Sequence, residues 1–266
     1  MARSYRNVTW HAGLTSALAV ALAGACGTVR DTAAIVGKGA GVDAGDGGPA
    51  MINGQPIASL AIDPPTATLV TNGSPATAQF RAIATLADGT TTDVSSSVTW
   101  SAHSPQVGSV GSAGLFTASG ALGGIVSLTA GAGGKTGSAV LTVDLKLPPD
   151  TGGVPPAAQG PLQGATAADG TVVVAYPYDG TVFPRGIGEA PLMWLNGAAT
   201  DVYFVHLSSA TFDFEGFFSA PTGRYDIDQT VWQRFTDSTN GAAEMKLARC
   251  NRSALSSTAS IRSILP

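Results

Sequence analysis

Residues 98–120 read VTWSAHSPQVGSVGSAGLFTASG, and the interpretation of the whole chain depends on this stretch. It holds one Trp, one His, several serines and closely spaced glycines, which fits either a catalytic loop or the inside of a small β-domain. From residue 57 to residue 145, short runs of alternating apolar and polar side chains are separated by turn residues. Because this period and run length are typical of half-buried strands, we predict about seven strands forming a small β-sandwich.

The same region carries a recognisable order of landmark residues. They are Leu60, Ile62, Pro64, Phe80, Ala82, Ala84, Asp88, Gly89, Asp93, Val94, Val98, Trp100, Ala102, Val107, Val110, Gly114, Leu115, Thr117, Ala118, Leu128, Thr129 and Ala130. Their order and spacing resemble the group 2 bacterial immunoglobulin-like domain, a module also found in intimin- and invasin-type adhesins. The resemblance covers about residues 57–145. It implies a spacer, adhesion or binding module.

The resemblance also implies structural roles for residues in and around the opening stretch. Phe80, Trp100 and Leu115 are expected in the core, with the Trp100 indole on a middle strand and enclosed between two sheets. Gly114 is expected in a turn that needs a positive φ. The alternative for Trp100 is an exposed ring on which a carbohydrate stacks.

Composition favours an all-β protein. The 266 residues include 34 glycines and 16 prolines, and only 12% of them are charged, so long helices with charged faces are not expected. The formal net charge of −4 gives no basic footprint for nucleic acid.

The N-terminal residues predict export. Arg3 and Arg6 precede a run of small and apolar residues at 12–25, too short to span a bilayer but typical of a secretory signal, so residues 1–25 are expected to be removed. Ala23-Gly-Ala25 fits ordinary signal peptidase, and the run that ends at Cys26 resembles the lipobox of bacterial lipoproteins, with Ala23 where that family prefers Leu. The resemblance implies a lipid on Cys26 and a membrane partner, and Gly27 favours the outer membrane. A disulfide between Cys26 and Cys250 is the alternative.

Glycine- and proline-rich segments divide the rest of the chain. Residues 26–56 are expected to be a flexible tether and residues 146–170 a Pro/Gly linker. Residues 171–266 predict a second β-sandwich, loosely similar to fibronectin-type modules. Its end is polar and lacks clear alternation, so the last strands are not expected and the unit is interpreted as incomplete.

Aromatic residues of the second unit suggest two further roles. Asp228 is placed to cap a short helix that carries Trp232 and Phe235 on one side. Phe217 and Phe218 are adjacent and cannot both face one side of a regular strand. Phe217 and Trp232 are therefore candidate ligand contacts, against the simpler interpretation that both are buried.

The motifs that suggest chemistry all fail on spacing or context. The stretch at 131–137, GAGGKTG, lacks the first glycine of a phosphate loop and precedes a strand pattern. The stretch at 110–114, VGSAG, lacks the first glycine of a nucleophile elbow. His103 and His206 have no second ligand at metal spacing. The sequence therefore predicts no catalytic residue, no cofactor and no metal.

These observations favour a non-catalytic lipoprotein of the cell envelope, whose immunoglobulin-like module is a spacer, adhesion or binding domain. Its partners would be the membrane and an envelope protein or polysaccharide. Two alternatives stay open. One is a carbohydrate-binding or accessory part of an extracellular enzyme, and the other is a truncated remnant of a larger envelope protein with propeller-type repeats.

Overall fold

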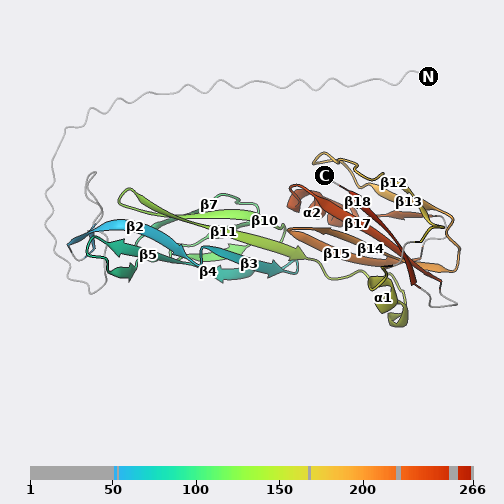
Figure 1. The fold of residues 1–266 in the computed structure, drawn as a ribbon, viewed down its shortest axis with the longest axis horizontal. Coiled ribbons are helices and arrows are strands. Elements are labelled where there is room, and N and C mark those ends of the chain that lie inside the picture. Colours follow the sequence, from blue (N-terminus) through green and yellow to red (C-terminus); the bar gives the residue numbers. More distant parts are fainter. Residues whose placement is uncertain (1–50, 53, 167–168, 220–222, 252–256, 265–266) are drawn as a thin grey trace, which may run out of the picture. The chain divides into compact units, whose positions relative to one another are not determined.

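The structure is a computed structural model that describes residues 51–52, 54–166, 169–219, 223–251 and 257–264 (Figure 1). Within these ranges the chain is mainly strand, and helix occurs twice. The chain is all-β, as the composition predicted. The predicted signal peptide, Cys26 and nearly all of the predicted tether lie outside the described residues.

Turns at Gly, Asp and Pro separate the elements. The strands are β1 (Met51–Ile52), β2 (Gln55–Asp63), β3 (Thr66–Thr71), β4 (Ala76–Gln79), β5 (Arg81–Leu86), β6 (Thr91–Asp93), β7 (Thr99–Ala102), β8 (Gly108–Val110), β9 (Leu115–Ala118), β10 (Gly124–Ala132), β11 (Lys135–Lys146), β12 (Val173–Tyr176), β13 (Pro191–Leu195), β14 (Asp201–Ser209), β15 (Phe212–Phe218), β16 (Arg224–Asp226), β17 (Ala243–Asn251) and β18 (Ser257–Ile264). The helices are α1 (Pro156–Gln163) and α2 (Gln229–Ser238).

The first sandwich uses β1 to β11. One layer has the order β3-β11-β10-β7, with β3 parallel to β11 and the other pairs antiparallel. In the other layer β2 pairs with β5. The chain breaks at Phe80 between β4 and β5, and β4 pairs with β9, which in turn pairs with β8. This division of strands is that of an immunoglobulin-like sandwich. Alternating side chains from both layers, such as Ile62, Leu128 and Leu141, fill the core.

Of the three predicted core positions, Phe80 is confirmed, Leu115 is wrong, and Trp100 packs on the core but not from the predicted middle strand. Phe80 is fully buried. Trp100 packs against the core but stays partly exposed, because β7 is an edge strand of its layer and not a middle one. Leu115 is 43% exposed, and its neighbour Phe116 is fully buried, so alternation along β9 turns Phe116 inward. Gly114 has φ +80°, which confirms the predicted positive-φ turn.

The second sandwich has a three-stranded layer, β12-β13-β16, and a four-stranded layer, β15-β14-β17-β18. Its core lies between the layers and includes Trp194, Tyr203, Phe218 and Trp232. The outer face of the four-stranded layer is also covered, because Ala158 and Leu162 of α1 pack with other buried residues there. Both faces of the four-stranded layer are therefore buried.

Two sequence-based expectations for the second part of the chain need correction, and a third is confirmed. Residues 257–264 form β18, which pairs with β17 along eight residues, so the sheet continues past the polar stretch where we expected no strand. Residues 156–163 of the predicted linker form α1, whose Pro161 and Gly160 hide the helical pattern. The predicted capped helix is present: the Asp228 carboxylate accepts hydrogen bonds from the backbone N–H groups of Thr230 and Val231.

Candidate functional site

The candidate site lies where the two sandwiches meet, and its base is the last part of β11. Leu145 and Lys146 pair in parallel with Phe212 and Asp213 of β15, so one sheet runs through both sandwiches. The Leu145 side chain is fully buried in the core of the second sandwich, although its strand begins in the first. All described residues belong to one compact unit.

The pairing continues into the stretch that the sequence predicted as linker. The backbone N–H of Leu147 donates to the Asp213 carbonyl at 2.9 Å, and that of Asp150 donates to the Glu215 carbonyl at 2.9 Å. The Phe217 N–H then donates back to the Asp150 carbonyl at 2.7 Å. Pro148 and Pro149 lack an N–H, which is tolerated because this segment is an edge. Each such bond contributes roughly 0.5–1.5 kcal/mol net. We call the segment from Leu145 to Asp150, which hydrogen-bonds along β15 like a strand, the seam.

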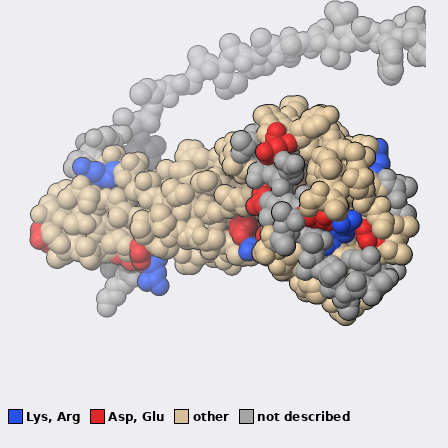
Figure 2. Space-filling model, turned by 45° about the vertical axis from the view of Figure 1, so that its right-hand side comes forward, with Lys and Arg blue, Asp and Glu red and all other residues tan. Residues whose placement is uncertain are grey.

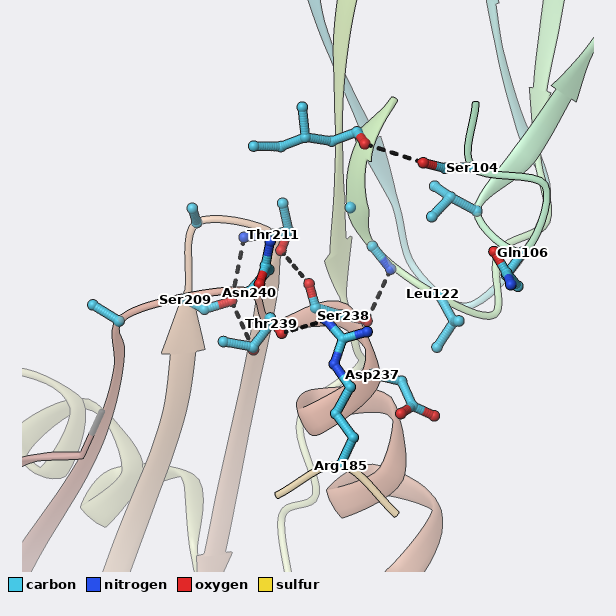
Figure 3. Close-up of a pocket in the computed structure, with 16 residues that line it drawn as sticks. Ser104, Gln106, Leu122, Arg185, Ser209, Thr211, Asp237, Ser238, Thr239 and Asn240 are labelled. Atoms are coloured by element: carbon cyan, nitrogen blue, oxygen red, sulfur yellow. Dashed lines mark hydrogen bonds between the residues drawn. The ribbon is translucent and has the colours of Figure 1, made fainter. Parts of the chain in front are cut away.

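A second contact joins the sandwiches through Gly123, Thr211 and Ser238, which we call the clasp (Figure 3). The Gly123 N–H donates to Ser238 Oγ at 2.9 Å, and Thr211 Oγ1 donates to the Ser238 carbonyl at 2.6 Å; both bonds are buried. A Cβ on Gly123 would lie directly on the Thr211 carbonyl oxygen. Glycine is therefore required here by close approach and not by its backbone angles.

Helix α2 positions the clasp. Trp232 and Phe235 bury one side of the helix in the core of the second sandwich, with 0% and 4% of their surface exposed. Asp228 caps the first turn, and Ser238 is the last helical residue. The fixed helix thus holds the Ser238 hydroxyl toward Gly123 of the first sandwich and the Ser238 carbonyl toward Thr211.

A crevice of about 460 Å³ opens beside the clasp, and both sandwiches line it (Figure 3). The lining residues are Ser104, Gln106, Val107, Leu122, Gly123, Gly124, Ile125, Arg185, Ser209, Ala210, Thr211, Asp237, Ser238, Thr239, Asn240 and Ala242. The apolar part is small and aliphatic, and the rest is hydroxyl, amide, carboxylate or guanidinium. Pockets of roughly 300–1,000 Å³ at domain boundaries are common ligand sites.

Arg185 is the cation of the crevice. It lies in the long connection between β12 and β13, and its side chain extends toward Ser238 and Thr239 (Figure 3). Its Nη2 donates to the Thr239 carbonyl at 3.3 Å. On the face shown in Figure 2, charged side chains are sparse, and acidic and basic residues occur in small groups.

Two ionic groups lie elsewhere in the second sandwich. On the outer face of the four-stranded layer, His206 Nε2 is 3.1 Å from Asp213 Oδ2. The hydrogen bond that His206 makes to the Asp213 carboxylate raises the pKa of His206 against the opposing effect of burial, and the same bond lowers the pKa of Asp213. This pair lies on a sheet face, with Glu215 beyond it bound to Gln163 of α1.

The second ionic group fixes strand ends. Arg249 of β17 contacts the carboxylates of Asp169 at 2.5 Å and Asp201 at 3.3 Å. Burial acts to raise the pKa of Asp169, but hydrogen bonds from Thr171 and the charge of Arg249 outweigh it, and the pKa is lowered. The group ties the segment before β12 to β14 and β17, which is a structural role.

The structure overturns both predicted ligand contacts. Phe217 is 2% exposed and packs under α1, and Trp232 is 0% exposed in the core of the second sandwich. The adjacent phenylalanines Phe217 and Phe218 face opposite sides of β15, and both sides are covered. The simpler interpretation of the sequence, burial of these rings, is the correct one.

The residues that form the site gave little signal in the sequence. Gly123 and Ser238 are separated by 115 positions, and Arg185 lies in a third segment with no motif around it. Of the predicted sites, Cys26 is outside the described residues, while Cys250 is fully buried beside Phe217 and Ala248. Within the described ranges, no group of three or more His, Cys, Asp or Glu side chains is arranged to hold a metal ion, and no helix is long and apolar enough to cross a membrane.

Comparison with known proteins gives distant likenesses in fold. No protein-family model matches the chain, and no curated protein matches it. Among solved structures, it is similar to the titin Ig tandem domains A164-A165, with 9% identity, a TM-score of 0.27, and 78% of this chain and 96% of that chain covered. It is also similar to domains 4-9 of the surface layer protein SbsC, with 11% identity, a TM-score of 0.26, and 79% of this chain and 31% of that chain covered.

Proposed function

We propose that this chain is an exported protein of the cell envelope, anchored by a lipid on Cys26, in which the immunoglobulin-like sandwich is a stiff spacer for the second sandwich. The observation that carries the proposal is the seam, where Leu145 to Asp150 hydrogen-bond along β15. A spacer fixes the position of the second sandwich only if the connection between the two sandwiches, here called the joint, does not bend. The seam and the clasp together supply such a joint, and the work of the protein is presentation and contact.

Membership of the group 2 bacterial immunoglobulin-like domains is part of this proposal. The landmark residues of 57–145 support it, and so does the division of β2 to β11 into two layers. The resemblance implies a spacer, adhesion or binding module. We infer the same use here.

The position of Cys250 supports acylation of Cys26 over a disulfide between the two. Cys250 has 0% exposed surface and lies in the cluster that α1 covers. Burial raises the pKa of its thiol, which lowers its reactivity as a thiolate. The lipobox-like run that ends at Cys26 supports a lipid there, and Gly27 favours delivery to the outer membrane.

Anchoring is tested by metabolic labelling of cells with an alkyne-bearing palmitate, followed by mass spectrometry of the mature N-terminus. We expect an acylated Cys26 in the membrane fraction and an unlabelled, released protein for Cys26→Ser. A variant at the second cysteine, Cys250→Ala, is the control and should stay labelled. An unacylated Cys26 in the wild type would remove the anchor from the proposal.

Stiffness is tested by distances between two spin labels, one at Lys135→Cys in the first sandwich and one at Gln233→Cys in the second. Both sites are exposed, and Cys26→Ser removes the tether thiol while Cys250 is buried. We expect one narrow distance distribution. A broad distribution would mean that the joint bends and that the spacer role fails.

A further inference from the structure

We propose that the crevice at the joint binds an acidic saccharide, namely a short sugar chain that contains a uronic acid. This goes beyond the spacer role and does not depend on it, because a stiff joint needs no ligand. The crevice is built from residues of both sandwiches, so its shape depends on the clasp that holds them together.

The walls of the crevice suit a polar, non-aromatic ligand. None of the lining residues is aromatic, and the apolar ones, such as Val107, Leu122 and Ile125, are small aliphatic groups. A flat hydrophobic ligand would find no ring to stack on. The volume of about 460 Å³ is large enough for more than a single small ion.

Three planar polar side chains at the crevice are available to a ligand. Gln106, Asp237 and Asn240 are exposed, and their side chains make no hydrogen bond to another residue among those described. A carboxylate or amide presents two adjacent polar atoms. Two neighbouring hydroxyl groups of a sugar ring match this spacing, with Asp237 accepting and the amides both donating and accepting.

Arg185 adds selectivity for a carboxylate. Its guanidinium has five N–H donors in a planar fork, and its hydrogen bond within the described residues is one long contact to the Thr239 carbonyl. A fork of this kind binds a carboxylate through two parallel bonds. The nearby Asp237 balances the charge, which favours a single carboxylate among hydroxyls over a dense polyanion.

The hydroxyl-bearing wall is preorganised. Thr211, Ser238 and Thr239 are almost fully buried, and Ser209 Oγ lies 3.1 Å from Thr239 Oγ1. Because these groups are already bonded to one another, they fix the wall from which Asp237 and Asn240 extend. A ligand would therefore meet a site that needs little reordering.

The test uses the full mature chain with Cys26→Ser, labelled with ¹⁵N and followed by NMR. The probes are digalacturonic acid, the neutral disaccharide galactobiose, and the acetylated dipeptide Ala-Glu as a carboxylate from a peptide. We expect digalacturonic acid to shift amide signals of Gly123, Thr239 and Asn240, and to bind at least about tenfold more tightly than either other probe.

Two arginine variants separate the site from general charge. Arg185→Gln should weaken digalacturonate binding about tenfold or more. Arg185→Lys keeps the charge without the planar fork of donors, so its affinity should lie between those of the wild type and Arg185→Gln. Arg224→Gln is the matched control, since Arg224 is an exposed arginine paired with Asp226 on β16, and it should bind like the wild type.

Three outcomes would overturn the inference. They are no shift with digalacturonic acid at millimolar concentration, equal weakening by Arg185→Gln and Arg224→Gln, and tighter binding of the peptide than of the sugar. A narrow spin-label distance together with any of these would leave the spacer role intact and remove only the saccharide site.

Discussion

At the scale of single residues, the first sandwich depends on how Gly114 lies under Trp100. The Gly114 carbonyl accepts the Phe80 N–H at 2.9 Å, at the point where β4 breaks into β5. Trp100 Nε1 donates to the Ser95 carbonyl at 2.8 Å, which holds the indole over the glycine. The indole is therefore fixed by one hydrogen bond and one close contact, although β7 is an edge strand.

Gly114→Ala should be strongly destabilising. A Cβ at this position would lie 2.7 Å from Trp100 Cζ2 and against the Phe80 carbonyl, on a backbone with φ +80°. Strained φ and overpacking together cost about 2–5 kcal/mol of unfolding free energy. Urea unfolding followed through first-sandwich NMR signals measures it. Gly89→Ala, with φ +84° and open space, is the control and should lose only about 1–2 kcal/mol.

The His206–Asp213 pair predicts a pH dependence. The pKa of His206 is raised in the folded state. Its contribution to folding stability is therefore complete at pH values below its unfolded pKa and is lost as the pH rises through its folded pKa. The pKa of Asp213 is lowered in the folded state, so its contribution to folding stability is lost only as the pH falls well into the acid range. Asp213→Asn should therefore reduce stability more at pH 5.5 than at pH 8.5.

The expected difference is small, about 0.2–1 kcal/mol, because both side chains are about one third exposed and water screens them. Urea unfolding of the wild type and Asp213→Asn at both pH values measures it. An equal loss at pH 5.5 and pH 8.5 would contradict the pairing.

At the scale of elements, the strands were predictable where burial is one-sided. In β5 the residues Ala82, Ala84 and Leu86 alternate with more exposed neighbours, and the same period marks β10 and β11. β18 was missed because its polar sequence gives no alternation, and its place comes from hydrogen bonding to β17. α1 was missed because Gly160 and Pro161 break the helical pattern, and its packing on Phe217 and Ala248 is long-range.

The core side chain of β9 shows a different error. Leu115 and Phe116 are adjacent and both apolar, so composition does not say which one faces inward. Register does: Phe116 lies opposite Ala78 of β4 and Val110 of β8, and it is fully buried. The ligand roles of Phe217 and Trp232 failed for a related reason, because sequence does not show that both faces of β15 are covered.

The cap of α2 gives a prediction at this scale. Asp228→Ala removes the acceptor for two backbone N–H groups and should cost about 0.5–2 kcal/mol of stability. The measurement is urea unfolding followed by Trp fluorescence. Asp179→Ala is the control, since the Asp179 carboxylate makes no hydrogen bond to another described residue. A loss equal to the control would mean that the cap does not hold α2.

At the scale of the whole molecule, the joint explains why the stretch after β11 is not a free linker. The sequence KLPPDTGG at 146–153 has the composition of a free linker, yet Leu145 before it is buried. The backbone N–H of Asp150 also donates to β15, and its carbonyl accepts from β15. The partners of this segment lie more than 60 residues further on, in β15. Local composition could not show them.

Gly123→Ala should loosen the joint without unfolding either sandwich. The backbone of Gly123 is not in the positive-φ region, so an Ala is opposed there only by close contacts, above all the collision of its Cβ with the Thr211 carbonyl oxygen and a tight contact with the Val143 carbonyl oxygen. Spin-label distances between Lys135→Cys and Gln233→Cys should broaden. Gly188→Ala, with no atom within 4 Å of the added Cβ, is the control. An unchanged distribution in Gly123→Ala would show that the clasp does not hold the joint.

Amide hydrogen exchange at Leu147 and Asp150 tests the central claim most directly. If the seam joins the two sandwiches, these amides donate to β15 and should exchange as slowly as those of central strands, about 10³-fold or more below the rate of an open chain. Exchange at the open-chain rate at both positions, with slow exchange kept in β11 and β15, would contradict the account.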